Sequence, residues 1–134
     1  MSVEHNLKPT LKGIRVLLAE DEPMAAKLAR GALRTMGITD VTHVSDGLEA
    51  LNTLNAGGYG FQLIVSDWNM PKVNGLDFLR QVRIMQPHMK FVMLTGHADR
   101  DLVLAAKDNR VDAYVVKPFS PEQLRRKVEA LFRY

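Results

Sequence analysis

The fold is decided by residues 63–71, which read Leu63-Ile-Val-Ser-Asp67-Trp-Asn-Met-Pro71. A short apolar run ends there in a single carboxylate, and a turn that contains Pro71 follows. Apolar runs of about four to eight residues, bounded by turn signals, are typical of strands buried on both faces of a parallel sheet. Ligands of such sheets bind at the carboxyl ends of the strands, so Asp67 is the first candidate for chemistry.

The same pattern recurs on both sides of this stretch. Short apolar runs predict five strands, at residues 14–19, 41–44, 63–66, 91–94 and 113–116. Amphipathic segments between them predict five helices, which begin at Pro23, Asp46, Asn74, about Asp99 and Ser120. The first is expected to end at Gly37 and the second at Gly57 and Gly58, while Ser120 with Gln123 predicts a capping box.

Apolar spacing also predicts which helical residues are buried. The expected inward positions are Ala25, Leu28, Ala29, Ala32 and Met36 in the first helix, Leu48, Leu51 and Leu54 in the second, and Leu76, Leu79 and Val82 in the third. Alternating strands and helices with short loops predict a doubly wound α/β domain with a parallel sheet. We expect a flexible extension over residues 1–12 and one folded domain over residues 13–134.

Composition removes several classes of function. The 134 residues include no cysteine, which excludes disulfide scaffolds, cysteine-ligated metals and thiol nucleophiles. No apolar run reaches the length of a membrane span or a signal peptide, so we expect a cytoplasmic protein without membrane contact. The net charge is only +3, and the basic residues Arg125, Arg126, Lys127 and Arg133 fit a solvated helix face, so no direct nucleic-acid binding is expected.

Polar residues follow four of the predicted strands, and their chemistry is complementary. Glu20 and Asp21 follow the first strand, Asp67 the third, Thr95 the fourth and Lys117 the fifth. Three carboxylates at one edge repel one another unless cations neutralise them, and Mg²⁺ prefers such hard oxygen ligands. The pattern therefore predicts a magnesium site with Asp67 as nucleophile toward a phosphoryl group, although any single acid here could serve only solvation or a helix start.

Together these motifs resemble the receiver domain of two-component response regulators, of the CheY-like kind. The likeness rests on residues 63–71, on Leu94-Thr95-Gly96 and on Tyr114-Val-Val-Lys117-Pro-Phe119, and it spans roughly residues 13–133. It implies a flavodoxin-like sheet in the order 2-1-3-4-5 and a switch in which Asp67 accepts a phosphoryl group in a Mg²⁺-dependent step.

The resemblance also implies individual roles. The backbone carbonyl of Asn69 would join Glu20, Asp21 and Asp67 at the metal, and Thr95 and Lys117 would contact the phosphoryl oxygens. Tyr114 would turn inward after phosphorylation, and the face formed by the fourth helix, fifth strand and fifth helix would then change its affinity for a partner. Asn69 and His97 would set the rate of hydrolysis. Glu20 stands where an Asp is frequent, which adds one methylene of reach.

The partners implied are a histidine kinase or phosphotransfer protein as donor and a downstream protein target. The protein is expected to be a monomer, with dimerisation on phosphorylation left open, and not an enzyme beyond its own phosphoryl transfer and dephosphorylation. A single-domain regulator, with a chemotaxis role left open, is the main hypothesis; a phosphorelay carrier or a receiver fragment of a larger regulator is the alternative.

Two further hypotheses are disfavoured by particular residues. A phosphohydrolase that forms an aspartyl phosphate would need a proton-transferring carboxylate where Asn69 stands. A flavodoxin-type cofactor carrier would need a phosphate-binding loop where Glu20, Asp21 and Glu22 would repel the phosphate.

Overall fold

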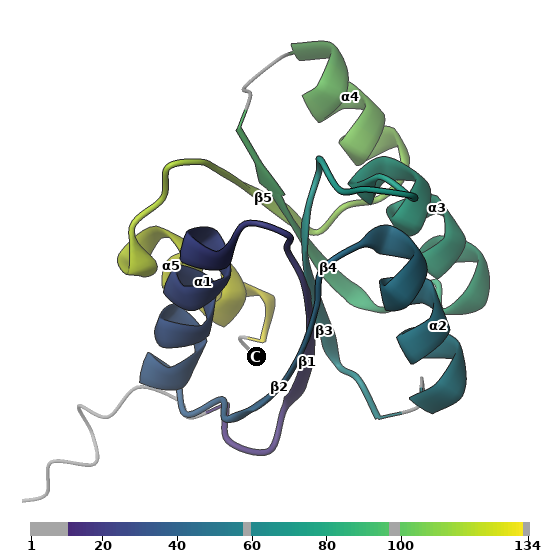
Figure 1. Ribbon diagram of the computed structural model, residues 1–134. Coiled ribbons are helices and arrows are strands. Elements are labelled where there is room, and N and C mark those ends of the chain that lie inside the picture. The colour runs from purple at the N-terminus through teal and green to yellow at the C-terminus, as the bar shows by residue number, and fades with distance from the viewer. Residues whose placement is uncertain (1–10, 58–59, 97–99, 133–134) are drawn as a thin grey trace, which may run out of the picture.

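The computed structural model describes residues 11–57, 60–96 and 100–132. Strands and helices alternate along this part of the chain (Figure 1). The strands are β1 (Arg15–Ala19), β2 (Asp40–Val44), β3 (Leu63–Asp67), β4 (Lys90–Thr95) and β5 (Ala113–Val116). The helices are α1 (Pro23–Thr35), α2 (Gly47–Gly57), α3 (Gly75–Met85), α4 (Arg100–Asp108) and α5 (Pro121–Leu131).

All neighbouring strands are parallel, and the order across the sheet is β2-β1-β3-β4-β5. Figure 1 shows α1 and α5 on one face of the sheet and α2, α3 and α4 on the other. The predicted doubly wound α/β architecture and strand order are therefore confirmed. The order changes direction between β1 and β3, and this point is where open α/β sheets place their ligands.

Each face of the sheet has its own hydrophobic core, because successive strand residues point to opposite sides. In β1, Val16 and Leu18 belong to the core beneath α1 and α5, whereas Leu17 and Ala19 belong to the core beneath α2, α3 and α4. Every residue of β3 is buried. This central strand, the one described strand that is buried at every residue, therefore presents Asp67 at its end.

The buried stripe of three helices differs from the predicted one by part of a turn. Leu28 of α1 is 38% exposed and Leu48 of α2 is 44% exposed, although both were expected to be buried. Leu76 of α3 is only partly buried. At 100° per residue these side chains lie about 90° or more from the centre of the buried face. The buried positions that the prediction omitted are Ala26 and Leu33 in α1, Ala50 in α2 and Phe78 in α3.

The ends of the helices were predicted more accurately than their buried faces. Ser120 Oγ accepts the backbone N–H of Gln123 at 3.2 Å and Gln123 Oε1 accepts that of Ser120 at 2.7 Å, which completes the capping box of α5. Gly37 follows α1 with φ of 89°, the left-handed conformation that glycine tolerates best. Asp46 Oδ1 accepts the backbone N–H of Glu49 at 2.7 Å.

The described chain begins with a residue that belongs to the core. Leu11 is buried in the core beneath α1 and α5, and its backbone N–H donates to the Met36 carbonyl at 3.0 Å. Packing contacts thus begin before Gly13. Residues 1–10 lie outside the described residues, as does Asp99, where the fourth helix was expected to begin. Within the described ranges, no helix has both the length and the apolar character that crossing a bilayer requires.

Candidate functional site

The residues expected to carry the chemistry are tied to the ends of the strands by backbone hydrogen bonds. The N–H of Glu20 donates to Val44 O at 3.0 Å, that of Trp68 to Leu94 O at 2.8 Å, and that of Lys117 to Thr95 O at 2.7 Å. These bonds continue the sheet about one residue beyond the strands. They bring Glu20, Asp67, Thr95 and Lys117 to one edge, as the sequence predicts.

Lys117 joins two of the acids. Its Nζ lies 2.6 Å from Glu20 Oε1 and 3.3 Å from Asp67 Oδ1. The side chain of Glu20 is fully buried, and those of Asp67 and Lys117 are 7% and 16% exposed. The ammonium forms a close ion pair with the buried Glu20 Oε1. Its companion, Glu20 Oε2, accepts the backbone N–H of Glu22 at 3.1 Å.

Burial makes negative charge costly at this edge. Desolvation raises the pKa of Glu20 from 4.5 to about 7, and the neighbouring Asp67 adds to the rise, although Lys117 and the Glu22 N–H oppose it. Desolvation also raises the pKa of Asp67, against the attraction of Lys117. Burial by itself would lower the pKa of Lys117, but its contacts with Glu20 and Asp67 outweigh burial and raise it. One ammonium does not balance the two carboxylates.

These residues fit a divalent cation. Carboxylate oxygens of Glu20, Asp21 and Asp67 lie within 4.8 Å of one another, and Asp21 is exposed, so the cluster is open to solvent on that side. Two buried carboxylates face a single ammonium, and an additional cation would offset the remaining negative charge. Hard oxygen donors with room for water ligands suit Mg²⁺.

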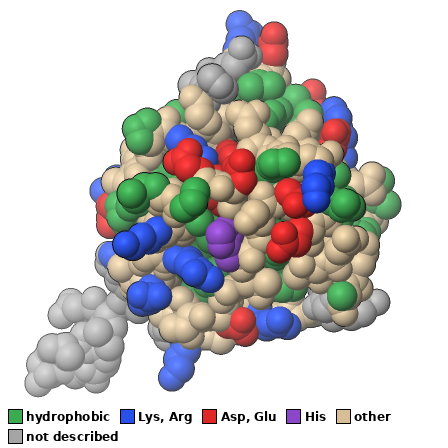
Figure 2. Space-filling view, in the orientation of Figure 1, with side chains coloured by type: hydrophobic (Ala, Val, Ile, Leu, Met, Phe, Trp, Pro, Cys, Tyr) green, Lys and Arg blue, Asp and Glu red, His purple; other side chains and the backbone are tan. Residues whose placement is uncertain are grey.

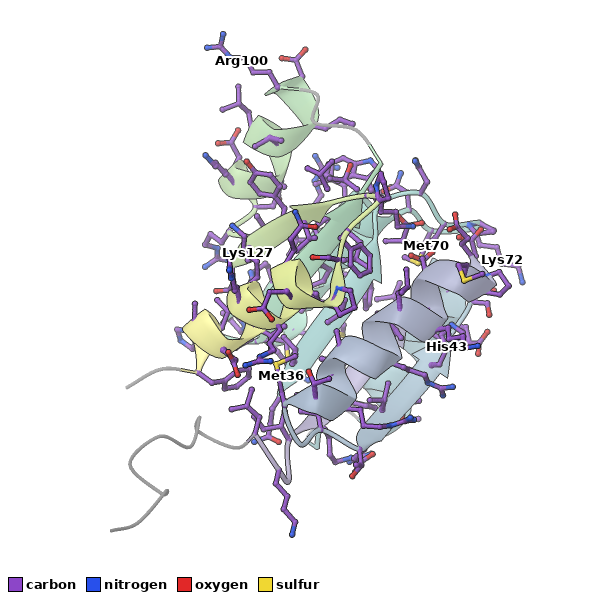
Figure 3. The ribbon with its side chains drawn as sticks, turned by 90° about the vertical axis from the view of Figure 1, so that its left-hand side faces the viewer. Met36, His43, Met70, Lys72, Arg100 and Lys127 are labelled. Atoms are coloured by element: carbon purple, nitrogen blue, oxygen red, sulfur yellow. The ribbon has the colours of Figure 1, made fainter. Side chains whose placement is uncertain are left out.

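Asn69 lies on the loop that follows β3, where the sequence predicts an additional metal ligand. Its side chain is exposed, and its backbone N–H interacts with the Asp67 carboxylate, which favours the charged form of Asp67. Figure 3 labels Met70 and Lys72 of the same loop at the end of the molecule opposite Met36. Lys72 Nζ pairs with Asp46 Oδ2 at 3.7 Å, so this lysine faces α2.

Two glycines that sequence reasoning did not select hold this loop in place. The N–H of Gly75 donates to Trp68 O at 2.7 Å, and a Cβ on Gly75 would collide with the carbonyl oxygen of Asp67. The N–H of Gly47 donates to Pro71 O at 3.3 Å, and a Cβ there would collide with the carbonyl of Val73. Both glycines are the first residue of a helix, although alanine has a higher helix propensity than glycine. This unfavourable residue type was the sequence feature by which the two positions could have been selected.

Tyr114 and Thr95 share a narrow apolar pocket on the side of the sheet covered by α4. Trp68, Met93 and three residues of α4 complete its lining: Leu102, Val103 and Ala106. Tyr114 is half-buried, and Lys127 Nζ of α5 lies 5.9 Å from the centre of its ring. The pocket gives the Tyr114 side chain an apolar environment beside Thr95. His97, the remaining predicted site residue, lies outside the described residues.

Comparisons with known proteins identify the family. Residues 16–129 match the model of the response regulator receiver domain. Over 121 residues the chain is 36% identical to the chemotaxis protein CheY of Pseudomonas aeruginosa, covering 89% of this chain and 96% of the relative. It is 32% identical over 123 residues to CheY-3 of Vibrio cholerae, covering 90% and 93%.

Solved structures agree with the sequence relatives. The chemotaxis response regulator CheY4 of Vibrio cholerae superposes with a TM-score of 0.78 at 29% identity, covering 88% of this chain and 98% of that chain. A receiver domain protein of Clostridium thermocellum superposes with a TM-score of 0.79 at 26% identity, covering 87% and 92%. The chain therefore belongs to the response regulator receiver family and is of the CheY type. Domains of this family are signalling modules rather than classical enzymes, and they bind Mg²⁺ at an acidic pocket.

Proposed function

We propose that this protein is a phosphorylation-dependent switch of the chemotaxis type, in which Asp67 accepts a phosphoryl group from the phosphohistidine of a kinase or phosphotransfer protein. The observation that carries the proposal is the cluster of Glu20, Asp21 and Asp67 at the switch point of the sheet, with Lys117 in contact with Glu20 and Asp67. The names of the relatives in Pseudomonas and Vibrio support the chemotaxis assignment.

In the proposed transfer, an Asp67 carboxylate oxygen attacks phosphorus, the new P–O bond forms, and the P–N bond to the donor histidine breaks. The electron pair of that bond returns to the imidazole nitrogen, which takes up a proton from solvent. Lys117 lies where its ammonium can neutralise charge on the transferred oxygens, and Thr95 at the end of β4 supplies a hydroxyl to the same edge.

Glu20, Asp21, Asp67 and the Asn69 carbonyl are the proposed metal ligands, and bound Mg²⁺ would offset the negative charge of the incoming phosphoryl group. Asp21 is exposed and suits direct coordination, whereas buried Glu20, which Lys117 already contacts, suits an indirect role through water. Asn69 and His97 are proposed to set the lifetime of the acyl phosphate. A lifetime that is unchanged in His97→Ala would contradict that role for His97.

The proposed output is a change at the surface formed by α4, β5 and α5. A phosphoryl group on Asp67 would attract the Thr95 hydroxyl, and Tyr114 would then occupy the apolar pocket beside Thr95 more fully. Leu104 of α4 is 46% exposed and Val116 of β5 is 38% exposed. These apolar side chains support contact of this surface with a protein target.

Intact mass after incubation with acetyl phosphate tests the chemistry. We expect one added phosphoryl group that requires both Mg²⁺ and Asp67, and no addition to Asp67→Asn or in the presence of a chelator. Trp68, the only tryptophan, is 8% exposed beside the site, and its fluorescence should report metal binding in parallel. A folded protein that acquires no phosphoryl group from acetyl phosphate or from a phosphorylated kinase would refute the proposal.

A further inference from the structure

A basic groove runs along the outer edge of the molecule between α1 and β2, and one end of it reaches Asp21 of the acidic cluster. Its central part has a volume of about 550 Å³ and is lined by Lys27, Arg30 and Arg34 of α1 together with His43 and Ser45. Arg30 and Arg34 also line the adjoining depression beside Ile38, Thr39 and Val41. Figure 2 shows Lys and Arg side chains gathered beside a histidine on this side, and Figure 3 shows His43 next to α1.

The three cations of the groove have no carboxylate partners among the described residues. No ion pair involves Lys27, Arg30 or Arg34 among the described residues, and all three are exposed. The basic helix α5 is the contrast, since Arg125 and Arg126 pair with Glu122 and Glu129 of their own helix. The positive charge of α1 is therefore available to an anionic ligand.

The other wall of the groove is an edge strand. In the described sheet β2 pairs with β1 alone, so its outer backbone groups have no partner strand. Val41 and His43 alternate along β2 on the same side as Ser45, just beyond its end, and all three line the groove or its extension. An exposed edge of this kind is able to accept an extended peptide as an additional strand.

The spacing of the cations suits such a peptide. Lys27, Arg30 and Arg34 follow one helical stripe and span about 10 Å along the axis at 1.5 Å per residue. Alternate side chains of an extended chain are about 6.7 Å apart, so acids at every second position would reach successive cations. Neither part of the groove has a phenylalanine, tyrosine or tryptophan in its lining, which disfavours single-stranded nucleic acid because that ligand is usually held by aromatic stacking.

We infer that the groove between α1 and β2 docks an extended acidic segment of a protein partner, which adds to the β2 edge and places alternate carboxylates against Lys27, Arg30 and Arg34. Asp21, which belongs to the acidic cluster, is the only carboxylate in the groove lining. The acidic segment would therefore lie toward Arg30 and Arg34, away from Asp21. This surface is separate from the one formed by α4, β5 and α5.

Fluorescence anisotropy with a labelled peptide of alternating Glu and Thr tests the inference. We expect Arg30→Gln with Arg34→Gln to weaken binding about tenfold, because two exposed ion pairs are lost. The control, Lys107→Gln with Arg126→Gln, changes net charge equally on other helices and should leave binding unchanged. Circular dichroism should show both double variants folded, and Asp67 phosphorylation should proceed normally in each.

Two further ligands test whether the groove binds a peptide as an added strand and whether it prefers that peptide to nucleic acid. A peptide of the same sequence with N-methyl groups at alternate residues cannot supply all of the backbone donors of a strand, and it should bind more weakly than the parent peptide. A single-stranded oligonucleotide should bind more weakly than the alternating peptide at the same salt concentration. The inference is overturned if the acidic peptide does not bind, if both double variants bind it equally, or if the oligonucleotide is the tighter ligand.

Discussion

Two buried ionic clusters lie at opposite ends of the strands, and they differ in the balance of their charges. At the carboxyl edge, a single ammonium, that of Lys117, faces the two carboxylates of Glu20 and Asp67. At the amino edge, Arg83 and Asp112 form an ion pair at 3.0 Å. The first cluster has more negative than positive charge, whereas the second is balanced.

The amino-edge cluster is a structural clamp. Arg83 donates to Met89 O at 2.7 Å, to Arg110 O at 2.7 and 3.1 Å, and to Asp112 Oδ2 at 3.0 Å. Asp112 Oδ2 also accepts the N–H of Phe91 at 2.7 Å. Burial lowers the pKa of Arg83, and Asp112 opposes that change. A buried charge with satisfied donors stabilises loops, whereas an unbalanced cluster is suited to bind another ion.

The largest expected effect is on chemistry at the carboxyl edge. Lys117→Met should lower the rate of Asp67 phosphorylation by acetyl phosphate by about a hundredfold, because it removes a charge that stabilises the transferred oxygens. A time course of intact mass measures the rate. Arg83→Met is the matched control and should retain the rate of the parent protein as long as it is folded. An equal loss of phosphorylation rate in both variants would contradict the inference that only the carboxyl-edge cluster takes part in the chemistry.

For the free energy of unfolding, we expect Arg83→Met to have a larger effect than Lys117→Met. Arg83→Met should lower the free energy of unfolding by about 3 kcal/mol, since it leaves Asp112 and two carbonyls without their buried partner. Lys117→Met should lower the free energy of unfolding by a smaller amount, because Glu20 and Asp67 can take up protons once the ammonium is removed. Urea unfolding of both variants measures the difference. A larger loss in Lys117→Met would show that the carboxyl edge is the stronger structural element.

A smaller effect is expected at Gly75, which supports the Asp67 loop by close approach. Gly75→Ala should lower the free energy of unfolding by about 2 kcal/mol, because the added Cβ meets the backbone of Asp67 and Trp68. Gly31→Ala is the control: its Cβ has open space within α1, and it should stabilise by about 0.5 kcal/mol. Thermal or urea unfolding checks both values, and a neutral Gly75→Ala would contradict the close packing of the loop.

The remaining expected effect is the pH dependence contributed by Glu20. Its pKa is about 7 in the folded protein against 4.5 ordinarily, so the folded state holds this proton more tightly than the unfolded state. The associated stability is fully present below pH 4.5 and is lost as the pH rises toward 7. Unfolding in metal-free buffer should show this decline, and Glu20→Gln should flatten it. Excess Mg²⁺ should also oppose it, since the metal binds the ionised carboxylate.

The convergence of the candidate site residues at one end of the sheet could be predicted because it depends on local sequence. Glu20, Asp67, Thr95 and Lys117 each follow or end an apolar run, and parallel strands bring such positions to one edge. The cap formed by Ser120 and Gln123 was predictable for the same reason, since both partners lie within one helical turn.

Other features depend on partners that are distant in the chain. No sequence motif marks Arg83 as a buried residue. Its carbonyl and carboxylate partners come from the segments before β4 and β5. Leu28 and Leu48 fit an apolar period, yet the sheet contacts the neighbouring faces of their helices. Gly47 and Gly75 matter because other segments of backbone approach them. None of these contacts is encoded in a short window of residues.

The amino-acid sequence by itself determined the order of strands and helices along the chain, the receiver resemblance and the residues that meet at the carboxyl edge, because periodicity, caps and turns act over a few residues. Only the tertiary structure decided that Lys117 approaches Glu20 more closely than Asp67, and that Lys27, Arg30 and Arg34 border an open groove beside the β2 edge. The physical reason is that burial and ion pairing depend on how distant segments pack, which local propensity does not specify.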